Sequence, residues 1–383
     1  MYLVDYCFKK STGMLPSMPV KHNFLRIFAK KLFALNTFHT LTISEVKQET
    51  SNSVSIRFIV PDNLKEAFLF KAGQYITIRH QSNGNEIRRA YSICSHPSSG
   101  ILKVGVKKVK GGVFSEFANS QLRVGDKLDV MTPGGKFVLD PNPQVSKNYA
   151  AFVAGSGITP VLSIIQTALE EEPNSSFSLV YGNQTEEGTM FLKDLQELRE
   201  SYPNRLTLTY AYSRAKVDNA HFGRIDRPFV NFLLKNDFKG INFHDFYLCG
   251  PETMIEVVTS TLKANQVNNE QIHYELFTAS EGDLSVESHD GNSSITIVVD
   301  DETETFTMPQ SKSILEAALA NKIDAPYSCQ GGICSTCIAR VIEGKAEMKK
   351  NQILTDEEIA DGLILTCQAH PTTATLTVDY DDV

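Results

Sequence analysis

Four cysteines near the C-terminus have a spacing that suits an iron–sulfur cluster. Cys329, Cys334 and Cys337 form a C-x4-C-x2-C pattern, and Cys367 follows after 29 further residues. Plant-type [2Fe–2S] centres use this spacing, with four thiolates holding two irons. Two glycines, at 331 and 332, allow the loop to turn tightly. Structural zinc is the weaker alternative, because it usually uses closely spaced pairs. The spacing predicts a [2Fe–2S] cluster but leaves open which two cysteines hold each iron.

A second group of residues suits a flavin. Arg89-Ala-Tyr91-Ser92 ends an expected strand, and Gly112-Val-Phe-Ser115 opens an expected helix. Arginine can neutralise a phosphate, a tyrosine ring can pack on the isoalloxazine, and a serine hydroxyl can reach its reactive nitrogen. Free amides at a helix N-terminus suit a pyrophosphate. These residues predict a flavin site; for the tyrosine alone, simple core packing is the alternative.

A third group suits a nicotinamide dinucleotide. The stretch Gly155-Ser-Gly157-Ile-Thr159-Pro160 follows an apolar strand, with Pro160 in the place of the third glycine of the usual fingerprint. Cys249-Gly250-Pro251 and Glu275-Leu-Phe277 follow two later strands. In a parallel sheet such strand ends share one edge, where ligands bind. Each motif alone could be an ordinary turn, but their recurrence at one edge predicts a binding site.

Three residues favour NADPH over NADH. Ser213, Arg214 and Arg224 follow the third strand of this expected sheet. Their side chains could bind the additional phosphate of NADPH through charge-assisted hydrogen bonds. The alternative is that they are solvated charges on a loop.

The pattern of elements divides the chain into parts. Residues 37–145 carry short alternating strands, which predict a closed antiparallel β-barrel. Residues 146–280 alternate buried strands with helices, which is typical of a parallel sheet, here of five strands, covered on both faces. Residues 281–292 are polar and are predicted to be a linker. Residues 293–383 predict a small sheet with one helix lying on it, so the fold class is multi-domain.

Composition excludes several classes of protein. Hydrophobic residues make up 42% of the 383 residues, as in globular proteins, and no apolar run approaches the roughly 18 residues of a membrane span. A net charge of −8 gives no reason to expect nucleic-acid binding. Seven cysteines without a secretory signal indicate a reduced, cytoplasmic protein. Residues 1–36 are basic and could form a surface helix or a frayed leader before Met18.

Taken in order, these motifs resemble the ferredoxin–NADP reductase superfamily, with a plant-type ferredoxin of the α+β β-grasp type appended. Residues 37–383 are most similar to the reductase subunits of phenylacetyl-CoA epoxidases. The resemblance implies FAD on the barrel, NADPH on the parallel sheet, and electrons leaving through the cluster to a di-iron oxygenase component. One departure is Gln184, which stands where those reductases have an arginine.

The motifs and the resemblance together define the expected site. The resemblance places Ser92, Cys249 and Glu275 around the hydride path. The expected cofactor-binding residues are Arg89, Tyr91, Ser92, Lys107, Gly112, Ser115, Gly155, Gly157, Thr159, Pro160, Ser213, Arg214, Arg224, Cys249, Gly250 and Phe277.

The expected function is to divide electron pairs. NADPH gives two electrons at once and a cluster accepts one, so a flavin between them connects the two. Two alternatives remain open. The acceptor could be another oxygenase, a desaturase or a cytochrome, or the chain could be an electron-carrier subunit without its own nicotinamide reaction. The complete Gly155–Pro160 turn argues against the carrier.

Overall fold

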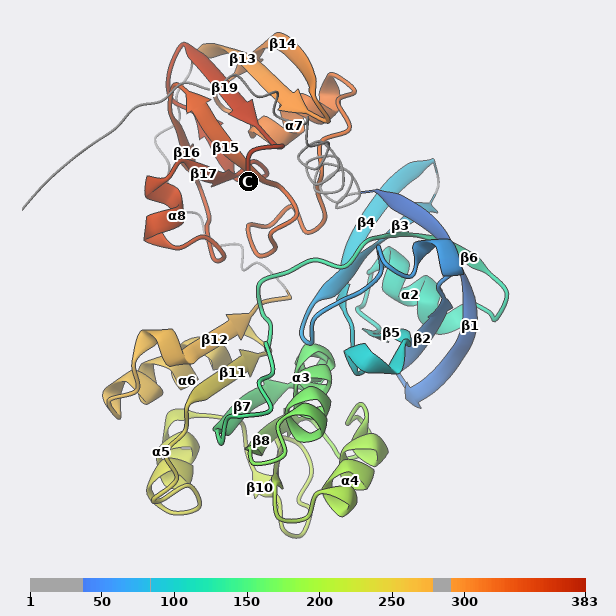
Figure 1. The fold of residues 1–383 in the computed structure, drawn as a ribbon, viewed down its shortest axis with the longest axis vertical. Helices are drawn as coiled ribbons and strands as arrows, with labels where there is room; N and C mark the ends of the chain where they lie inside the picture. Colours follow the sequence, from blue (N-terminus) through green and yellow to red (C-terminus); the bar gives the residue numbers. More distant parts are fainter. Residues whose placement is uncertain (1–36, 83, 278–290) are drawn as a thin grey trace, which may run out of the picture.

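The computed structural model describes residues 37–82, 84–277 and 291–383, which form three sheets with their helices (Figure 1). The expected basic segment at residues 1–36 and most of the expected linker lie outside the described residues. Within the described residues, no helix is long and apolar enough to cross a membrane.

The first sheet is the predicted antiparallel barrel. Its strand order is β4-β3-β6-β1-β2-β5, and an isolated bridge between Ile93 and Val104 joins its two ends. Alternate side chains, such as Leu41 and Ile43 on β1, point into a fully buried core. The strands are β1 (Phe38–Thr50), β2 (Ser53–Ile59), β3 (Tyr75–Ser82), β4 (Asn85–Ser92), β5 (Leu102–Lys107) and β6 (Lys127–Met131), with helix α2 at Val113–Ser120.

The second sheet is parallel, as predicted, and its order is β10-β9-β8-β7-β11-β12. It has six strands rather than the five expected, because β10 (His221–Phe222) is too short to leave a sequence pattern. The other strands are β7 (Asn148–Ala154), β8 (Ser176–Asn183), β9 (Leu206–Tyr212), β11 (Asp245–Cys249) and β12 (Ile272–Glu275).

Helices cover both faces of this parallel sheet. One face packs on α3 (Ile158–Glu171) and α4 (Leu192–Ser201), and the other on α5 (Arg227–Lys235) and α6 (Glu252–Ala264). The chain runs from β7 outward through β8 and β9, and then returns to β11 on the other side of β7. The strand order therefore reverses between β7 and β11, which is where open α/β sheets bind their ligands.

The third sheet is smaller and carries α7 (Ile314–Ala320), as predicted, together with a second short helix, α8 (Asp356–Ala360), that the sequence pattern did not predict. Its order is β14-β13-β19-β15-β17, with β16 and β18 paired separately. Helix α7 begins with a capping box, in which Ser313 and Glu316 bond to each other's backbone N–H. The remaining elements are β13 (Asn292–Val299), β14 (Glu302–Pro309), β15 (Ile338–Glu343), β16 (Ala346–Met348), β17 (Leu363–Leu365), β18 (Ala369–Pro371) and β19 (Thr375–Asp379).

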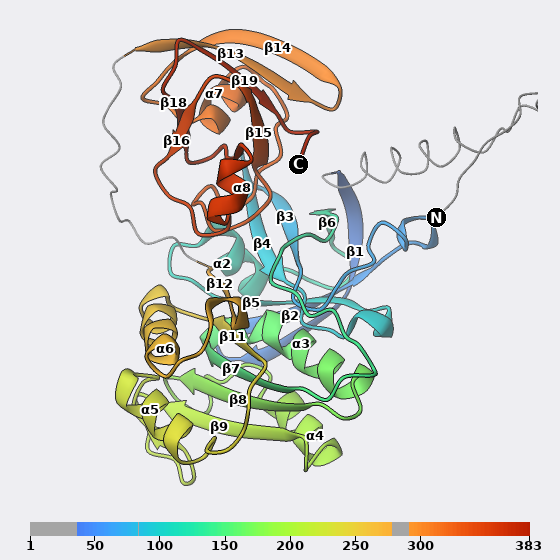
Figure 2. The same ribbon diagram turned by 60° about the vertical axis from the view of Figure 1, so that its left-hand side comes forward.

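The barrel contacts both other sheets (Figures 1 and 2). Toward the parallel sheet, the Ser163 hydroxyl on α3 donates to the Ser95 carbonyl at 2.6 Å. A Cβ on Gly105 of β5 would lie 2.7 Å from Cγ2 of Thr159, so the barrel and α3 approach closely. Toward the C-terminal sheet, the contacts come mainly from β3 and β4 and are described below.

Candidate redox site

Two of the predicted dinucleotide motifs meet at the reversal point of the parallel sheet. Gly155–Gly157 forms a single 3₁₀ turn after β7 and leads directly into α3, with Gly155 at φ +57°. A Cβ on Gly157 would lie 2.2 Å from the Cys249 carbonyl oxygen, so only glycine permits this approach. The Tyr181 hydroxyl donates to the Gly155 carbonyl at 2.9 Å and supports the turn. Thr159 and Pro160, in the first turn of α3, are buried behind it.

The three residues expected around the hydride path come together in the interior. The Ser92 hydroxyl, at the end of β4, donates to Oε2 of Glu275 at 3.0 Å, and both side chains are buried. Burial raises the pKa of Glu275 to about 8 against the lowering effect of the Ser92 hydrogen bond. Cys249 pairs with Glu275 in the register of β11 and β12, and burial raises its thiol pKa well above the usual range. At neutral pH the site therefore carries a neutral carboxyl group and a neutral thiol.

The expected pyrophosphate residues of the flavin lie together at the start of α2. Gly112 is the N-cap of α2, and a Cβ there would lie 2.5 Å from the Ser115 hydroxyl oxygen. That hydroxyl accepts from the Val109 N–H at 3.1 Å and donates to the Gly112 carbonyl at 2.9 Å. A side chain at position 112 would clash with this hydroxyl, so glycine is what allows Ser115 to contact the loop at the N-terminus of α2, where free amides suit a phosphate.

The remaining flavin candidates come from β4 and β5. The Tyr91 ring lies 5.4 Å from that of Phe114, and burial raises its pKa. Arg89 is exposed and donates to the Arg88 carbonyl at 2.7 Å. Burial lowers the pKa of Lys107, whose Nζ lies 3.3 Å from where a Cβ on Gly155 would be. The Lys107 ammonium group, on the barrel, therefore lies at the Gly155 turn of the parallel sheet. This position suits a pyrophosphate bound between the barrel and the parallel sheet.

The structure does not bring every candidate to this centre. The backbone N–H of Ser213 and of Arg214 bond to the Asn183 and Gln184 carbonyls at 3.0 and 2.9 Å, after β9. Arg214 and Arg224 are exposed, and Phe277 is 38% exposed. Ser213, Arg214 and Arg224 follow β9 and β10 at one edge of the sheet, whereas Phe277 follows β12 at the other edge, two residues after Glu275.

Sequence reasoning missed Asn183 at the end of β8. In the part of the chain that the structure describes, neither atom of its buried side-chain amide has a hydrogen-bond partner. An unpaired buried amide at the ligand edge of the sheet fits a polar group of a bound dinucleotide. The sequence feature that could have indicated Asn183 is the Tyr181-Gly-Asn183 stretch at the end of β8.

The four cysteine thiols of the C-terminal part are neighbours. Cys329 lies against Cys334 and Cys367, and Cys367 lies against Cys337. The Gly331 N–H donates to the Cys329 sulfur at 3.3 Å. Among the described residues, no three His, Cys, Asp or Glu side chains converge as ligands of a single metal ion. A two-iron rhomb needs two thiolates per iron, and the four neighbouring thiols can supply them.

One cavity lies where the three parts of the chain meet. It has a volume of about 430 Å³ and is lined by residues of the barrel, of the parallel-sheet part and of the C-terminal part. The barrel contributes Tyr75, the parallel sheet contributes Glu275, and the cysteine loop contributes Cys334. The hydroxyl of Tyr75 is 2.9 Å from Oγ1 of Thr336 and 3.3 Å from Oγ of Ser335, inside the cysteine loop. No motif signalled Tyr75, because its partners lie about 260 residues further along the chain.

Three family profiles match successive parts of the chain. They are the oxidoreductase FAD-binding domain over residues 40–139, the oxidoreductase NAD-binding domain over 152–260 and the 2Fe-2S iron-sulfur cluster binding domain over 297–372.

Two curated relatives match almost the whole chain. One subunit of the 1,2-phenylacetyl-CoA epoxidase of Escherichia coli is 39% identical, with 91% of this chain and 99% of that protein covered. The ferredoxin reductase component of 3-ketosteroid-9-alpha-monooxygenase from Rhodococcus rhodochrous is 32% identical, with 89% and 96% covered. Among solved structures, phthalate dioxygenase reductase has the same fold, with a TM-score of 0.56, 23% identity, and 89% and 98% of the two chains covered.

Proposed function

Because the chain belongs to the family of oxygenase reductases that combine FAD-binding, NAD-binding and [2Fe–2S] domains, we propose that it carries electrons from NADPH to a phenylacetyl-CoA epoxidase. The acceptor would be the di-iron component of that oxygenase. The observation that carries the proposal is the shared cavity, since Glu275 of the nicotinamide edge and Cys334 of the cysteine loop line it together. Bound FAD would supply the conversion from electron pairs to single electrons.

Each part of the chain has a task in this proposal. Residues 37–145 bind FAD, residues 146–280 bind NADPH, residues 281–292 link them to the last part, and residues 293–383 hold the cluster. The residues proposed to contact FAD are Arg89, Tyr91, Ser92, Lys107, Gly112 and Ser115. The residues proposed to contact the nicotinamide dinucleotide are Gly155, Gly157, Thr159, Pro160, Ser213, Arg214, Arg224, Cys249, Gly250 and Phe277. The cluster ligands are Cys329, Cys334, Cys337 and Cys367.

The buried centre orients its ligands rather than titrating during turnover. With Glu275 protonated near neutral pH, the Ser92–Glu275 pair adds no charge to the space between the two rings. The Tyr91 ring, the Ser92 hydroxyl and the Cys249 thiol then restrict how two planar rings can lie. Holding reactants in a productive geometry contributes as much as about 7–11 kcal/mol in favourable cases.

Reconstitution with candidate acceptors tests the proposed function. The holoprotein, NADPH and the oxygenase component of a phenylacetyl-CoA epoxidase are expected to form epoxidised product, while omission of the reductase abolishes it. A 3-ketosteroid monooxygenase component serves as the competing acceptor, because the relative that is 32% identical carries that name. Faster turnover with the steroid oxygenase would overturn the choice of acceptor. A flavin that NADPH fails to bleach without air would identify an electron carrier instead.

A further inference from the structure

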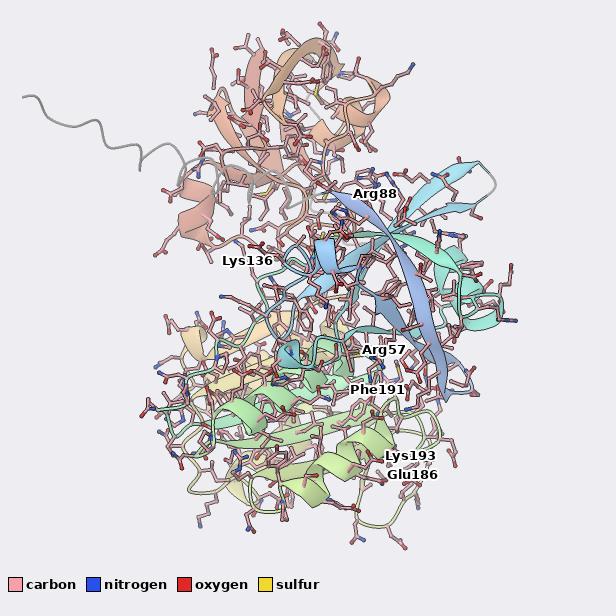
Figure 3. The ribbon with its side chains drawn as sticks, turned by 45° about the vertical axis from the view of Figure 1, so that its right-hand side comes forward. Arg57, Arg88, Lys136, Glu186, Phe191 and Lys193 are labelled. Atoms are coloured by element: carbon pink, nitrogen blue, oxygen red, sulfur yellow. The ribbon has the colours of Figure 1, made fainter. Side chains whose placement is uncertain are left out.

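Arg88 makes an unusual set of contacts between the barrel and the C-terminal part. Its side chain is only 6% exposed, and its guanidinium lies 4.1 Å from the ring centre of Tyr327 and 4.9 Å from that of Phe38. It donates to Glu86 at 2.8 Å and to Asp324 at 3.1 Å. Figure 3 shows Arg88 on the side of the barrel that faces the C-terminal sheet. A buried arginine between two aromatic rings is typical of residues that dominate an interface.

The contacts of Arg88 differ in how much they stabilise the interface. Asp324 is 83% exposed, so its ion pair with Arg88 is screened and contributes little. The Tyr327 ring is the main contact of Arg88 across the interface, and the Tyr327 hydroxyl donates to Oε1 of Glu86 at 3.4 Å. The planar guanidinium can stack on the ring and bond to Glu86 at the same time, which lysine cannot do.

Arg88 lies on the strand that carries the flavin candidates. Alternation along β4 directs Arg88 toward the C-terminal part, while Arg89, the next residue, is exposed. Strand β4 pairs with β3, with Tyr75 opposite Ser92, and Tyr75 contacts the cysteine loop through Thr336. One pair of strands therefore holds the expected flavin residues at one end and contacts the C-terminal part at two places.

We propose that Arg88, through Tyr327, is a positioning residue that sets the cysteine loop against the flavin side of the shared cavity. The inference rests on the proposed function, in which one electron at a time leaves the reduced flavin and reduces the cluster, with NADPH as the source of electrons. The described contacts of Arg88 are with Glu86, Asp324, Tyr327 and Phe38, so it acts through the placement of the two parts.

Arg79 provides a matched control. It lies on β3, stacks on Phe38 at 4.3 Å and pairs with Asp129 at 3.1 Å, and both of these contacts lie within the barrel. Tyr327→Phe is a second control, since it keeps the ring on Arg88 and removes only the hydroxyl. Tyr327→Ala removes the ring from the opposite side of the interface and tests the same contact without touching the flavin strand.

Chemical cross-linking measures the placement without any activity. Lys136 of the barrel pairs with Glu358 of the C-terminal part, and Figure 3 shows Lys136 on the same side as Arg88. A carbodiimide should join this pair as an amide in the full-length holoprotein, and peptide mass spectrometry quantifies it. The cross-linked fraction should fall severalfold in Arg88→Ala and Tyr327→Ala, and stay unchanged in Arg79→Ala and Tyr327→Phe.

Single-turnover reduction without air provides the second readout. Flavin bleaching by NADPH should keep its rate in all four variants. Cluster reduction should slow at least about tenfold in Arg88→Ala and Tyr327→Ala, since small displacements of reacting groups are costly. If Arg88→Ala loses flavin, Tyr327→Ala decides the question.

Unchanged cross-linking and unchanged cluster reduction in Tyr327→Ala would overturn the positioning role. A wild-type flavin that NADPH does not bleach would instead overturn the proposed function, and the cross-linking result would still decide the role of Arg88.

Discussion

Ser92 of the barrel and Glu275 of the parallel sheet form a buried hydrogen bond of 3.0 Å, although 183 residues separate them. This bond joins the ends of β4 and β12, and therefore the expected flavin and nicotinamide sites. Since Glu275 lines the same cavity as Cys334, the pair also lies beside the cysteine loop. Changes at this centre and at the turns around it should therefore have separable effects on stability, on dinucleotide binding and on electron flow.

Glu275→Gln should reduce the pH dependence of stability. The pKa of Glu275 is about 8 in the folded chain, against an ordinary 4.5, so the folded state binds the extra proton between these values. The contribution of Glu275 to the free energy of unfolding is fully present below about pH 4.5 and is lost as the pH rises through 8. The total loss is at most on the order of 5 kcal/mol. The melting temperature of the wild type should fall more steeply from pH 5 to 8 than that of Glu275→Gln. Glu270→Gln, on an exposed side chain, should follow the wild type.

Gly157→Ala should weaken dinucleotide binding. The added methyl group would lie 2.2 Å from the Cys249 carbonyl oxygen, so the turn after β7 and the turn after β11 must separate. Overpacking of this kind costs about 1–3 kcal/mol. We expect a higher KM for NADPH by stopped-flow or steady-state assay, with flavin retained. Gly134→Ala is the control, because nothing lies within 4 Å of a Cβ there. An unchanged KM in Gly157→Ala would contradict the assigned turn.

Cys367→Ser should remove the cluster and leave the flavin. Loss of one of four thiolates opens the coordination of one iron. The paramagnetic signal after dithionite and the electron flow to the oxygenase should disappear, while NADPH still bleaches the flavin. Cys94→Ser is the matched control, since Cys94 is a buried barrel cysteine that lies outside the loop and hydrogen-bonds to the Lys103 carbonyl. A cluster that survives in Cys367→Ser would exclude this residue as a ligand.

The double variant Arg214→Ala, Arg224→Ala should lose the preference for NADPH that we propose. Each arginine is exposed at the rim of the parallel sheet, and a charge-assisted hydrogen bond contributes about 1.5–3 kcal/mol. The ratio of kcat/KM for NADPH to that for NADH should fall at least about tenfold. Arg227→Ala, which removes an exposed arginine bonded to Ser260, should leave the ratio unchanged. The choice of NADPH would be wrong if both proteins gave the wild-type ratio.

Local patterns in the chain were sufficient to predict the three-part architecture. Alternating apolar residues predicted the barrel strands, and buried runs followed by helices predicted the parallel sheet, because these patterns reflect which side chains are buried. The cysteine loop and the Gly155 turn could also be recognised, since a short loop must supply several ligands or bare amides within a few residues. The same logic failed for β10, where two residues are too few to show any period.

Local sequence patterns could not predict contacts between residues that are far apart in the chain. Arg88 and Arg89 are adjacent and chemically identical in the sequence, yet β4 directs only Arg88 into the interface with Tyr327. Residues 85–88, which are polar except for Ile87, gave no strand signal, and their pairing with β3 is imposed by the sheet rather than by their own preference. The raised pKa of Glu275 and the contact of Tyr75 with Thr336 likewise exist only after packing. The sequence by itself determined which groups can bind and react, because that depends on residue type and short spacing. Only the tertiary structure decided which of those groups line one cavity, because burial and proximity arise from the packing of the three parts of the chain together.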